Sequence, residues 1–158
     1  MQPSQPSISL RKLVVLGALQ LSALWDLVTT GLGILLILDN LNLVAISLAV
    51  IGTLIVVAFN FSTQAIWRRR QRLTAARLPL LGLRLVWLTA LLVDLWTSLT
   101  CNAWFIGEGA SDSLALGDVL ASLSPGQLII VVFVTLITGI SPMLVGYLHN
   151  RDIDSILH

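Results

Sequence analysis

Residues 13–38 read LVVLGALQLSALWDLVTTGLGILLIL, an apolar run in which Asp26 is the single ionisable residue. A helix needs about 20 residues to cross a bilayer core about 30 Å thick. Helices are expected because each one satisfies its own backbone hydrogen bonds in lipid. The run therefore predicts a membrane-spanning helix. It continues well beyond Ala23, the nearest small residue at which a signal peptide would be cut, which favours a retained span over a cleaved leader.

Three further runs of the same kind follow, at about 41–67, 80–106 and 127–148. Hydrophobic residues make up 56% of the 158-residue chain and charged residues 11%, whereas soluble domains carry about 25% charged residues. A small soluble domain leaves too much of its surface exposed to hide this apolar excess. The composition and the four runs together predict an all-α, integral membrane four-helix bundle.

The predicted membrane domain covers residues 10–150 and consists of two helical hairpins. The first hairpin turns at Asp39-Asn40, and the second has a longer outer loop in which we expect a short amphipathic helix, ended by Pro125-Gly126. Residues 1–9 have the Pro, Ser and Gln content of a disordered leader, and 151–158 form a short inner tail.

The charged residues predict the orientation of the chain in the membrane. All nine Lys and Arg residues belong to one set of helix ends: Arg11, Lys12, Arg68, Arg69, Arg70, Arg72, Arg77, Arg84 and Arg151. The loops on the other side carry only acidic charges: Asp39, Glu108, Asp112 and Asp118. Because basic residues are retained on the cytoplasmic side, we expect both termini to be cytoplasmic, in an inner or plasma-type membrane.

The arginine run Arg68, Arg69, Arg70 and Arg72 is the predicted contact with anionic lipid head groups. Each basic residue near an anionic surface contributes about 1 kcal/mol of attraction. An ordinary role in setting topology is the competing interpretation. Nucleic acid is not an expected partner, because no aromatic residues alternate with the arginines.

Two carboxyl groups fall near the middle of predicted spans, Asp26 in the first and Asp94 in the third, with no Lys or Arg at similar depth. A charged Asp at a helix centre costs about 2.5–3.5 kcal/mol on insertion scales. We expect each group to be protonated and hydrogen-bonded unless water or a cation reaches it. Hydroxyl residues accompany them at helical spacing: Thr29, Thr30, Thr97 and Ser98.

These six residues allow two interpretations. In the first, the carboxyls and hydroxyls bond across helices and hold the bundle together. In the second, they line a path for protons or cations, because intramembrane ionisable residues are functional candidates by default. The hexapeptide 25–30 also resembles 93–98 in its order of residue types. The two interpretations of this match are a short internal repeat and a chance similarity of residues that are common in membrane helices.

Other features of the spans have simpler interpretations. Pro142 is expected to kink the fourth span, because proline removes a helix hydrogen bond. Asn60-Phe61-Ser62 matches a glycosylation acceptor, but it lies in the inner half of a predicted span, where no transferase would reach it, so the match is interpreted as chance.

No reaction signature is present in the sequence. The chain has one cysteine, Cys101, and two histidines, His149 and His158, both at the inner end. It has no phosphate-binding glycine loop, no nucleophile elbow and no His-Glu-x-x-His helix. We therefore expect no enzyme activity, no cofactor and no metal.

The outline of four spans with a longer second outer loop resembles the topology of claudins and tetraspanins, without their outer-loop cysteine pair or Cys-Cys-Gly motif. Such topology carries no function by itself. The sequence indicates a structural or interaction protein, either self-assembling or a subunit of a membrane complex. The alternative is a small oligomeric channel or transporter that moves protons or cations past Asp26 and Asp94.

Overall fold

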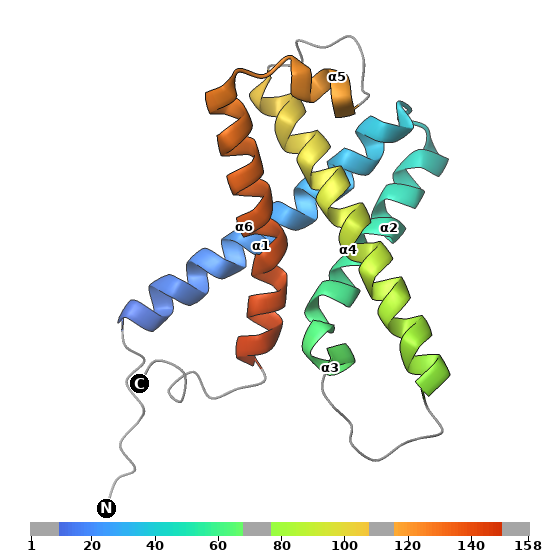
Figure 1. Cartoon of the computed structure of the whole chain (residues 1–158), viewed down its shortest axis with the longest axis vertical. Coiled ribbons are helices and arrows are strands. Elements are labelled where there is room, and N and C mark those ends of the chain that lie inside the picture. Colours follow the sequence, from blue (N-terminus) through green and yellow to red (C-terminus); the bar gives the residue numbers. More distant parts are fainter. Residues whose placement is uncertain (1–9, 68–76, 108–115, 150–158) are drawn as a thin grey trace, which may run out of the picture.

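A computed structural model describes residues 10–67, 77–107 and 116–149, and these residues form helices and short turns with no strand. The elements in chain order are α1 (Leu10–Leu38), α2 (Leu43–Phe61), α3 (Thr63–Trp67), α4 (Arg77–Ile106), α5 (Leu116–Ala121) and α6 (Pro125–His149) (Figure 1). Four helices, α1, α2, α4 and α6, are long and apolar enough to cross a membrane. The all-helical class is confirmed, and the helices are compatible with a multi-pass membrane protein.

The second apolar helix is shorter than the predicted span 41–67. α2 ends at Phe61, and α3 begins after Ser62, whose backbone N–H donates to the Ala58 carbonyl at 3.1 Å. At the other end of α2, the Asn42 side chain accepts a hydrogen bond from the Ala45 N–H at 2.8 Å. This N-cap satisfies a backbone donor that the helix itself leaves free.

The predicted turn at Asp39-Asn40 separates α1 from α2. Asp39 has a φ of 45°, in the left-handed region. Asp and Asn adopt this conformation more readily than most other side chains do. The Asp39 N–H donates to the Leu36 carbonyl at 3.2 Å, which closes the last turn of α1. The turn residue is therefore suited to ending one span and starting the next within a few residues.

The four long helices contact one another, and α1 packs most extensively on α4 and α6 (Figure 1). The start of α1, all of α3, the start of α4 and the end of α6 lie at the lower end of Figure 1. The α1–α2 turn, the end of α4, α5 and the start of α6 lie at the upper end. α1 and α4 therefore both run from the lower end to the upper end and cross each other on the way, whereas α2 and α6 run from the upper end to the lower end (Figure 1).

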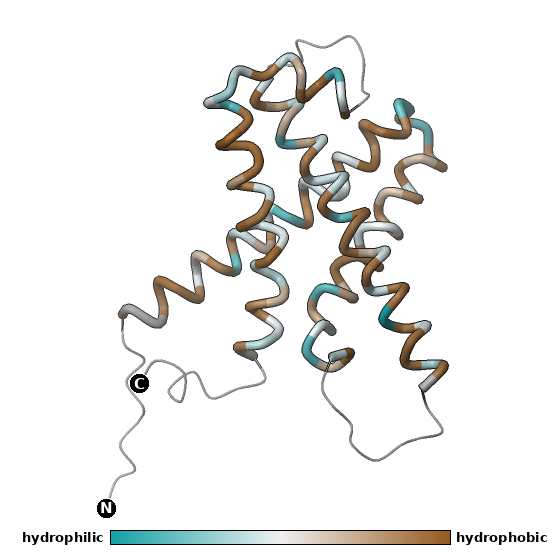
Figure 2. Tube along the Cα trace, in the orientation of Figure 1, coloured by the Kyte–Doolittle hydropathy of each residue, from teal (hydrophilic) through white to brown (hydrophobic). Residues whose placement is uncertain are grey.

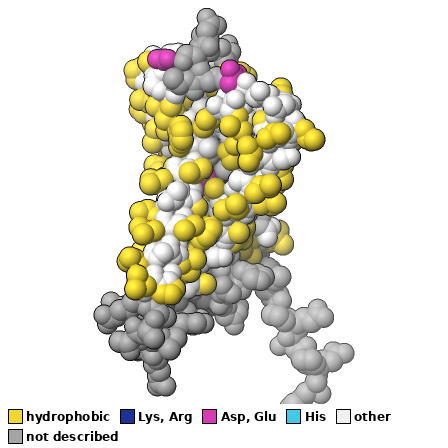
Figure 3. Space-filling view, turned by 90° about the vertical axis from the view of Figure 1, so that its right-hand side faces the viewer, with side chains coloured by type: hydrophobic (Ala, Val, Ile, Leu, Met, Phe, Trp, Pro, Cys, Tyr) yellow, Lys and Arg dark blue, Asp and Glu magenta, His cyan; other side chains and the backbone are white. Residues whose placement is uncertain are grey.

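Polar residues lie inside the molecule and apolar residues outside it, the reverse of a soluble protein. Leu, Ile, Val and Phe side chains remain exposed along every long helix. Hydrophobic side chains extend along the height of the described helices, and hydrophilic stretches recur where the helices cross (Figures 2 and 3). The buried polar residues are Asp26, Thr29, Thr30, Thr53, Asn60, Asp94, Thr97, Ser98, Thr100, Asn102, Thr135, Thr138 and Ser141. Hydrocarbon is the solvent that this distribution fits.

The loop between α4 and α6 contains a short helix, α5, as expected, but the predicted end at Pro125-Gly126 is wrong: α5 ends at Ala121, and Pro125 and Gly126 begin α6, where proline is tolerated in the first turn. Val119 of α5 is buried against Ala103 of α4 and Val131 of α6. Leu120 and Leu123 pack around the same cluster. α5 is thereby seated over the upper ends of both spans.

Close approach of backbones depends on two glycines. A β-carbon on Gly33 of α1 would collide with the backbone of Thr97 in α4, and one on Gly146 of α6 would meet the backbone of Phe61. Small residues allow membrane helices to approach closely and to gain van der Waals contact. The predicted leader 1–9 and tail 151–158 lie outside the described residues.

Candidate functional site

The two intramembrane carboxyls belong to a buried polar cluster at the crossing of α1, α2 and α4. Asp94 lies at its centre and is 1% exposed. The Thr30 hydroxyl of α1 donates to Asp94 Oδ1 at 2.5 Å, and the Asn60 amide of α2 donates to Oδ2 at 2.5 Å. Each oxygen therefore has its own donor, and one carboxyl joins three helices.

The hydroxyls around Asp94 form a connected set. Thr29 and Thr30 of α1 lie 3.0 Å and 3.2 Å from the Ser98 hydroxyl of α4. A hydroxyl oxygen can donate and accept hydrogen bonds at the same time. Ser98 therefore links Thr29 and Thr30 of α1 to α4 through one side chain.

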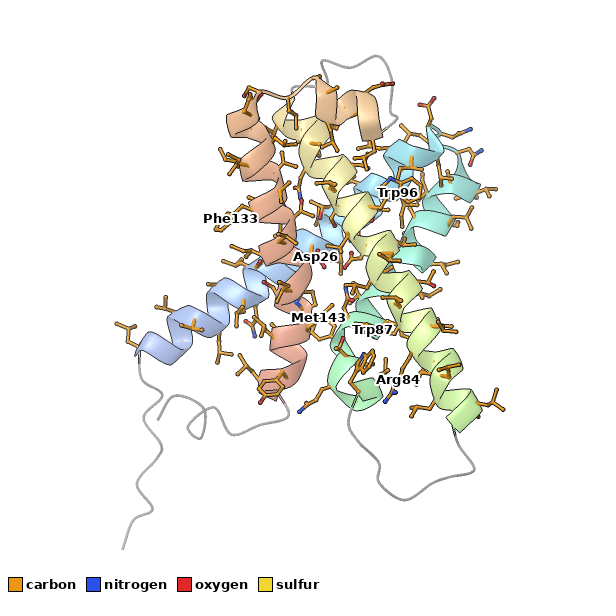
Figure 4. All side chains as sticks on the ribbon, in the orientation of Figure 1. Asp26, Arg84, Trp87, Trp96, Phe133 and Met143 are labelled. Atoms are coloured by element: carbon orange, nitrogen blue, oxygen red, sulfur yellow. The ribbon has the colours of Figure 1, made fainter. Side chains whose placement is uncertain are left out.

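Asp26 has different surroundings, although it is equally buried at 1% exposure. In the described part of the chain, neither of its carboxyl oxygens has a hydrogen-bond partner. The Ser98 hydroxyl, which contacts Thr29 and Thr30, is the polar side chain near it on α4. On its other side Asp26 faces Gly139 of α6, where a β-carbon would lie 3.9 Å from Oδ1. Figure 4 places Asp26 at mid-height among the helices.

A second set of polar contacts joins α1 and α4 to α6. The Trp25 indole N–H donates to Asn102 Oδ1 at 3.2 Å, and the Asn102 amide donates to the Thr135 hydroxyl at 3.0 Å. Further along α6, the Ser141 hydroxyl lies 2.8 Å from that of Ser22 in α1. These side chains satisfy one another across three helices without a charged group.

Of the six predicted polar residues, five meet in the cluster and one does not take part through its side chain. The Thr97 hydroxyl donates within its own helix, to the Val93 carbonyl at 2.9 Å and the Asp94 carbonyl at 3.1 Å. Thr29 also donates to the Asp26 carbonyl at 3.1 Å. Thr97 instead matters through its backbone, which Gly33 approaches.

Pro142 is fully buried inside α6, which continues through it without interruption. Proline leaves the carbonyl four residues earlier, that of Thr138, without a helical donor. The preceding Ser141 donates to the Ile137 carbonyl at 2.7 Å. The predicted kink stays a prediction.

Two functional candidates are absent from the sequence-based set, Asn60 and Asn102. Asn60 is fully buried and is the second donor to Asp94. The sequence feature that could have identified Asn60 is an amide side chain within an apolar run, because burying an amide without a hydrogen bond is costly. The match of Asn60-Phe61-Ser62 to a glycosylation acceptor offered another interpretation of the same residue.

The arginines Arg68, Arg69, Arg70 and Arg72 lie outside the described residues, so their predicted contact with head groups stays a prediction. Among the described residues, no group of three or more His, Cys, Asp or Glu side chains could hold a metal ion. Cys101 is buried with a free thiol.

Comparison of the chain with family models, with curated proteins and with solved structures found no match. The arrangement of the buried polar cluster offers two things, a set of bonds between helices around Asp94 and an unsatisfied carboxyl at Asp26.

Proposed function

We propose that this protein is a non-enzymatic, multi-pass membrane protein of structural or interaction type, which assembles with itself or holds a partner in a membrane complex. The observation that carries the proposal is the bonding of Asp94 to both Thr30 and Asn60. The polar atoms of the cluster are largely used within the chain, and apolar side chains cover the outside. Such a surface presents helices to lipid or to the helices of another membrane protein.

The proposed orientation places the lower end of Figure 1 in the cytoplasm. The start of α1 and the start of α4, which carry Arg11, Lys12 and Arg77 in the sequence, belong to this end. Asp39 and Asp118 belong to the upper end. The positive-inside bias supports this orientation in an inner or plasma-type membrane. Reporter fusions after 149 and within the α4–α6 loop are expected to give opposite compartments.

Assembly is tested by disulfide cross-linking between introduced cysteines in native membranes. Cys101 is fully buried, so the unmodified chain is the matched control that cannot link to a second copy. Single cysteines are introduced at an exposed position on each long helix: Leu21, Leu48, Leu92 and Ile129. A homo-oligomer gives a cross-linked dimer from the helix at the interface and from no other. A monomer in mild detergent, with no cross-linked dimer and no co-purifying protein, would contradict the proposal.

Asp26 favours a second candidate function, the movement of protons or monovalent cations. A buried carboxyl with no donor is an expensive arrangement unless a proton, a cation or water completes it. The Asn60 side-chain oxygen is likewise buried and unpartnered among the described residues. The cluster thus has more acceptor oxygens than hydrogen-bond donors. A bound proton or cation would supply the missing partner for these oxygens. One chain with four spans leaves little room for an internal path, so this function would require several copies.

Flux into liposomes, followed with a pH-sensitive dye and then a sodium-sensitive dye, tests the second candidate. Asp26→Asn is expected to abolish flux while leaving assembly intact, because it keeps the shape of the side chain and removes its ionisable group. Ser98→Ala tests whether the neighbouring hydroxyl is needed. Leu92→Ala, at an exposed position on α4, is the control. Absence of flux in the unmodified protein, or equal flux in Asp26→Asn, excludes this candidate and leaves the first.

A further inference from the structure

A separate cluster of aromatic and basic side chains lies at the lower end of the molecule, away from both carboxyls. It consists of Arg84 and Trp87 of α4 and Trp67 at the end of α3, and is called the Arg84 cluster below. The Arg84 guanidinium carbon lies 4.7 Å from the centre of the Trp67 ring. The Trp67 and Trp87 rings meet edge to face, with centroids 5.4 Å apart. Figure 4 shows Arg84 and Trp87 near the lower end of α4.

Two hydrogen bonds fix the position of Trp87 in the cluster. The Trp87 indole N–H donates to the Thr63 hydroxyl at 2.9 Å, and that hydroxyl donates to the Asn60 carbonyl at 2.7 Å. Trp87 is thereby fixed to the break between α2 and α3, and Trp67 is fixed against Trp87. The guanidinium consequently lies on a positioned aromatic face and is not free to move through many rotamers.

The charge of Arg84 lacks an acidic counterpart within the described part of the chain. Its Nε is buried and has no hydrogen-bond partner there. Asp94 lies ten residues further along α4, about 15 Å by helix rise. Asp39 and Asp118 belong to the opposite end of the molecule. A guanidinium placed this way, close to the end of a membrane helix, has donors available for an anion from outside the described residues.

We propose that the Arg84 cluster binds the phosphate of one anionic phospholipid in the leaflet at the lower end. The planar guanidinium presents paired donors that match phosphate oxygens, and it stacks on an aromatic ring at the same time. Tryptophan side chains prefer the level of lipid head groups. Leu80, Leu81 and Leu88 lie within about one helical turn of Arg84 and are 37%, 58% and 45% exposed. Their side chains provide the apolar surface for the acyl chains.

This site differs from the diffuse attraction expected of the arginine run 68–72. Diffuse attraction depends on the number of charges and follows any anionic surface. The Arg84 cluster instead combines one charge with a fixed ring, so it predicts a single bound lipid. It also predicts that lysine cannot replace arginine, because an ammonium is a point charge without the planar fork.

Native mass spectrometry of the full chain in mild detergent, titrated with phosphatidylglycerol or phosphatidylcholine, tests the proposal. We expect one tightly held phosphatidylglycerol per chain. Arg84→Gln should weaken that binding about twentyfold, the effect of losing a charge-assisted pair of hydrogen bonds. Arg77→Gln removes an arginine two turns away and should weaken it by less than about fivefold, as expected for diffuse attraction. Arg84→Lys should not restore tight binding.

Trp67→Leu provides an independent measurement that leaves the charge in place. Removing the ring beneath the guanidinium should weaken phosphatidylglycerol binding about fivefold, which corresponds to a cation–π contact near a membrane. If Arg84→Gln does not fold, as judged by the loss of its cooperative unfolding transition, lipid binding by Trp67→Leu tests the proposal instead. Equal losses from Arg84→Gln and Arg77→Gln, or full binding by Arg84→Lys and Trp67→Leu, would overturn the proposal. Competition by inorganic phosphate as effective as by the lipid would overturn it as well.

Discussion

Segments 25–30 of α1 and 93–98 of α4 place an Asp and two hydroxyl residues in the same order, yet their carboxyls have opposite surroundings. Asp94 accepts hydrogen bonds from two other helices. Asp26 accepts none from the described chain and lies beside Gly139. The same local sequence thus gives a satisfied carboxyl in one helix and an unsatisfied one in the other. The difference comes from the facing helices, because Asn60 of α2 reaches Asp94 and α6 presents Gly139 to Asp26.

Asp94→Ala should have the largest effect on stability. It leaves the Asn60 amide buried without its acceptor and removes the carboxyl partner of the Thr30 hydroxyl, and we expect the free energy of unfolding to fall by about 3 kcal/mol. Asp26→Ala removes the same atoms but strands no donor, so its loss should be below about 1 kcal/mol. Unfolding in a denaturing-detergent titration, followed by circular dichroism, measures both. If both variants lose the same free energy of unfolding, the hydrogen-bond donors around Asp94 do not make it more important for stability than Asp26.

Gly33→Ala should have the second-largest effect on stability, because the added methyl group would force α1 and α4 apart where the two segments meet. The added β-carbon would collide with the Thr97 backbone, which cannot move aside as a side chain would. Overpacking of this kind costs about 2 kcal/mol. Gly17→Ala, in the same helix, meets nothing within 4 Å and serves as the control. A loss no greater than that of Gly17→Ala would mean that α1 and α4 are not in close contact at this level.

Trp25→Phe tests the residue that precedes Asp26, which differs from the Val93 that precedes Asp94. The change keeps an aromatic ring and removes the N–H that donates to Asn102. Hydrogen bonds between membrane helices contribute about 0.6 kcal/mol on average, and we expect a loss of that size. Trp96→Phe is the control, since that indole donates no hydrogen bond within the described chain. The same unfolding titration should separate the two variants, and the assignment fails if they coincide.

Gly139→Ala should have the smallest effect. The new methyl group would lie 3.5 Å from Leu95 Cδ2 and 3.9 Å from Asp26 Oδ1, which are ordinary contacts. We expect the unfolding free energy to change by less than about 0.5 kcal/mol, in contrast to Gly33→Ala. If Asp26 accepts a proton or cation from this side, flux should fall even though stability does not. A large loss of stability would show that the Asp26 side of the cluster is as tightly packed as the Asp94 side.

The sequence was sufficient for much of the fold. Four apolar runs of membrane-crossing length predicted four long helices, and their boundaries agree with the structure to within about three residues, except at the end of the second run. The structure divides that run, 41–67, at Ser62, between Phe61 and Thr63. Hydropathy alone did not predict the break, since Ala65, Ile66 and Trp67 continue the apolar character past it.

The membership of the site was partly predictable. Asp26 and Asp94 stand out because no other acidic residue falls at the middle of a span. Thr29, Thr30 and Ser98 follow from helical spacing. Asn60 and Asn102 could not be assigned from spacing, because their partners lie on other helices, 34 positions away for Asp94 and 77 for Trp25.

The sequence by itself determined that the chain forms four apolar helices long enough to cross a membrane, and that hydroxyl residues accompany the two carboxyls at helical spacing. These properties follow from composition and from the 3.6-residue period, and both are local. The tertiary structure alone decided which carboxyl is satisfied. A hydrogen bond requires a donor within about 3 Å, and only the crossing of α1, α2 and α4 brings Thr30 and Asn60 to Asp94 while leaving Asp26 beside a glycine.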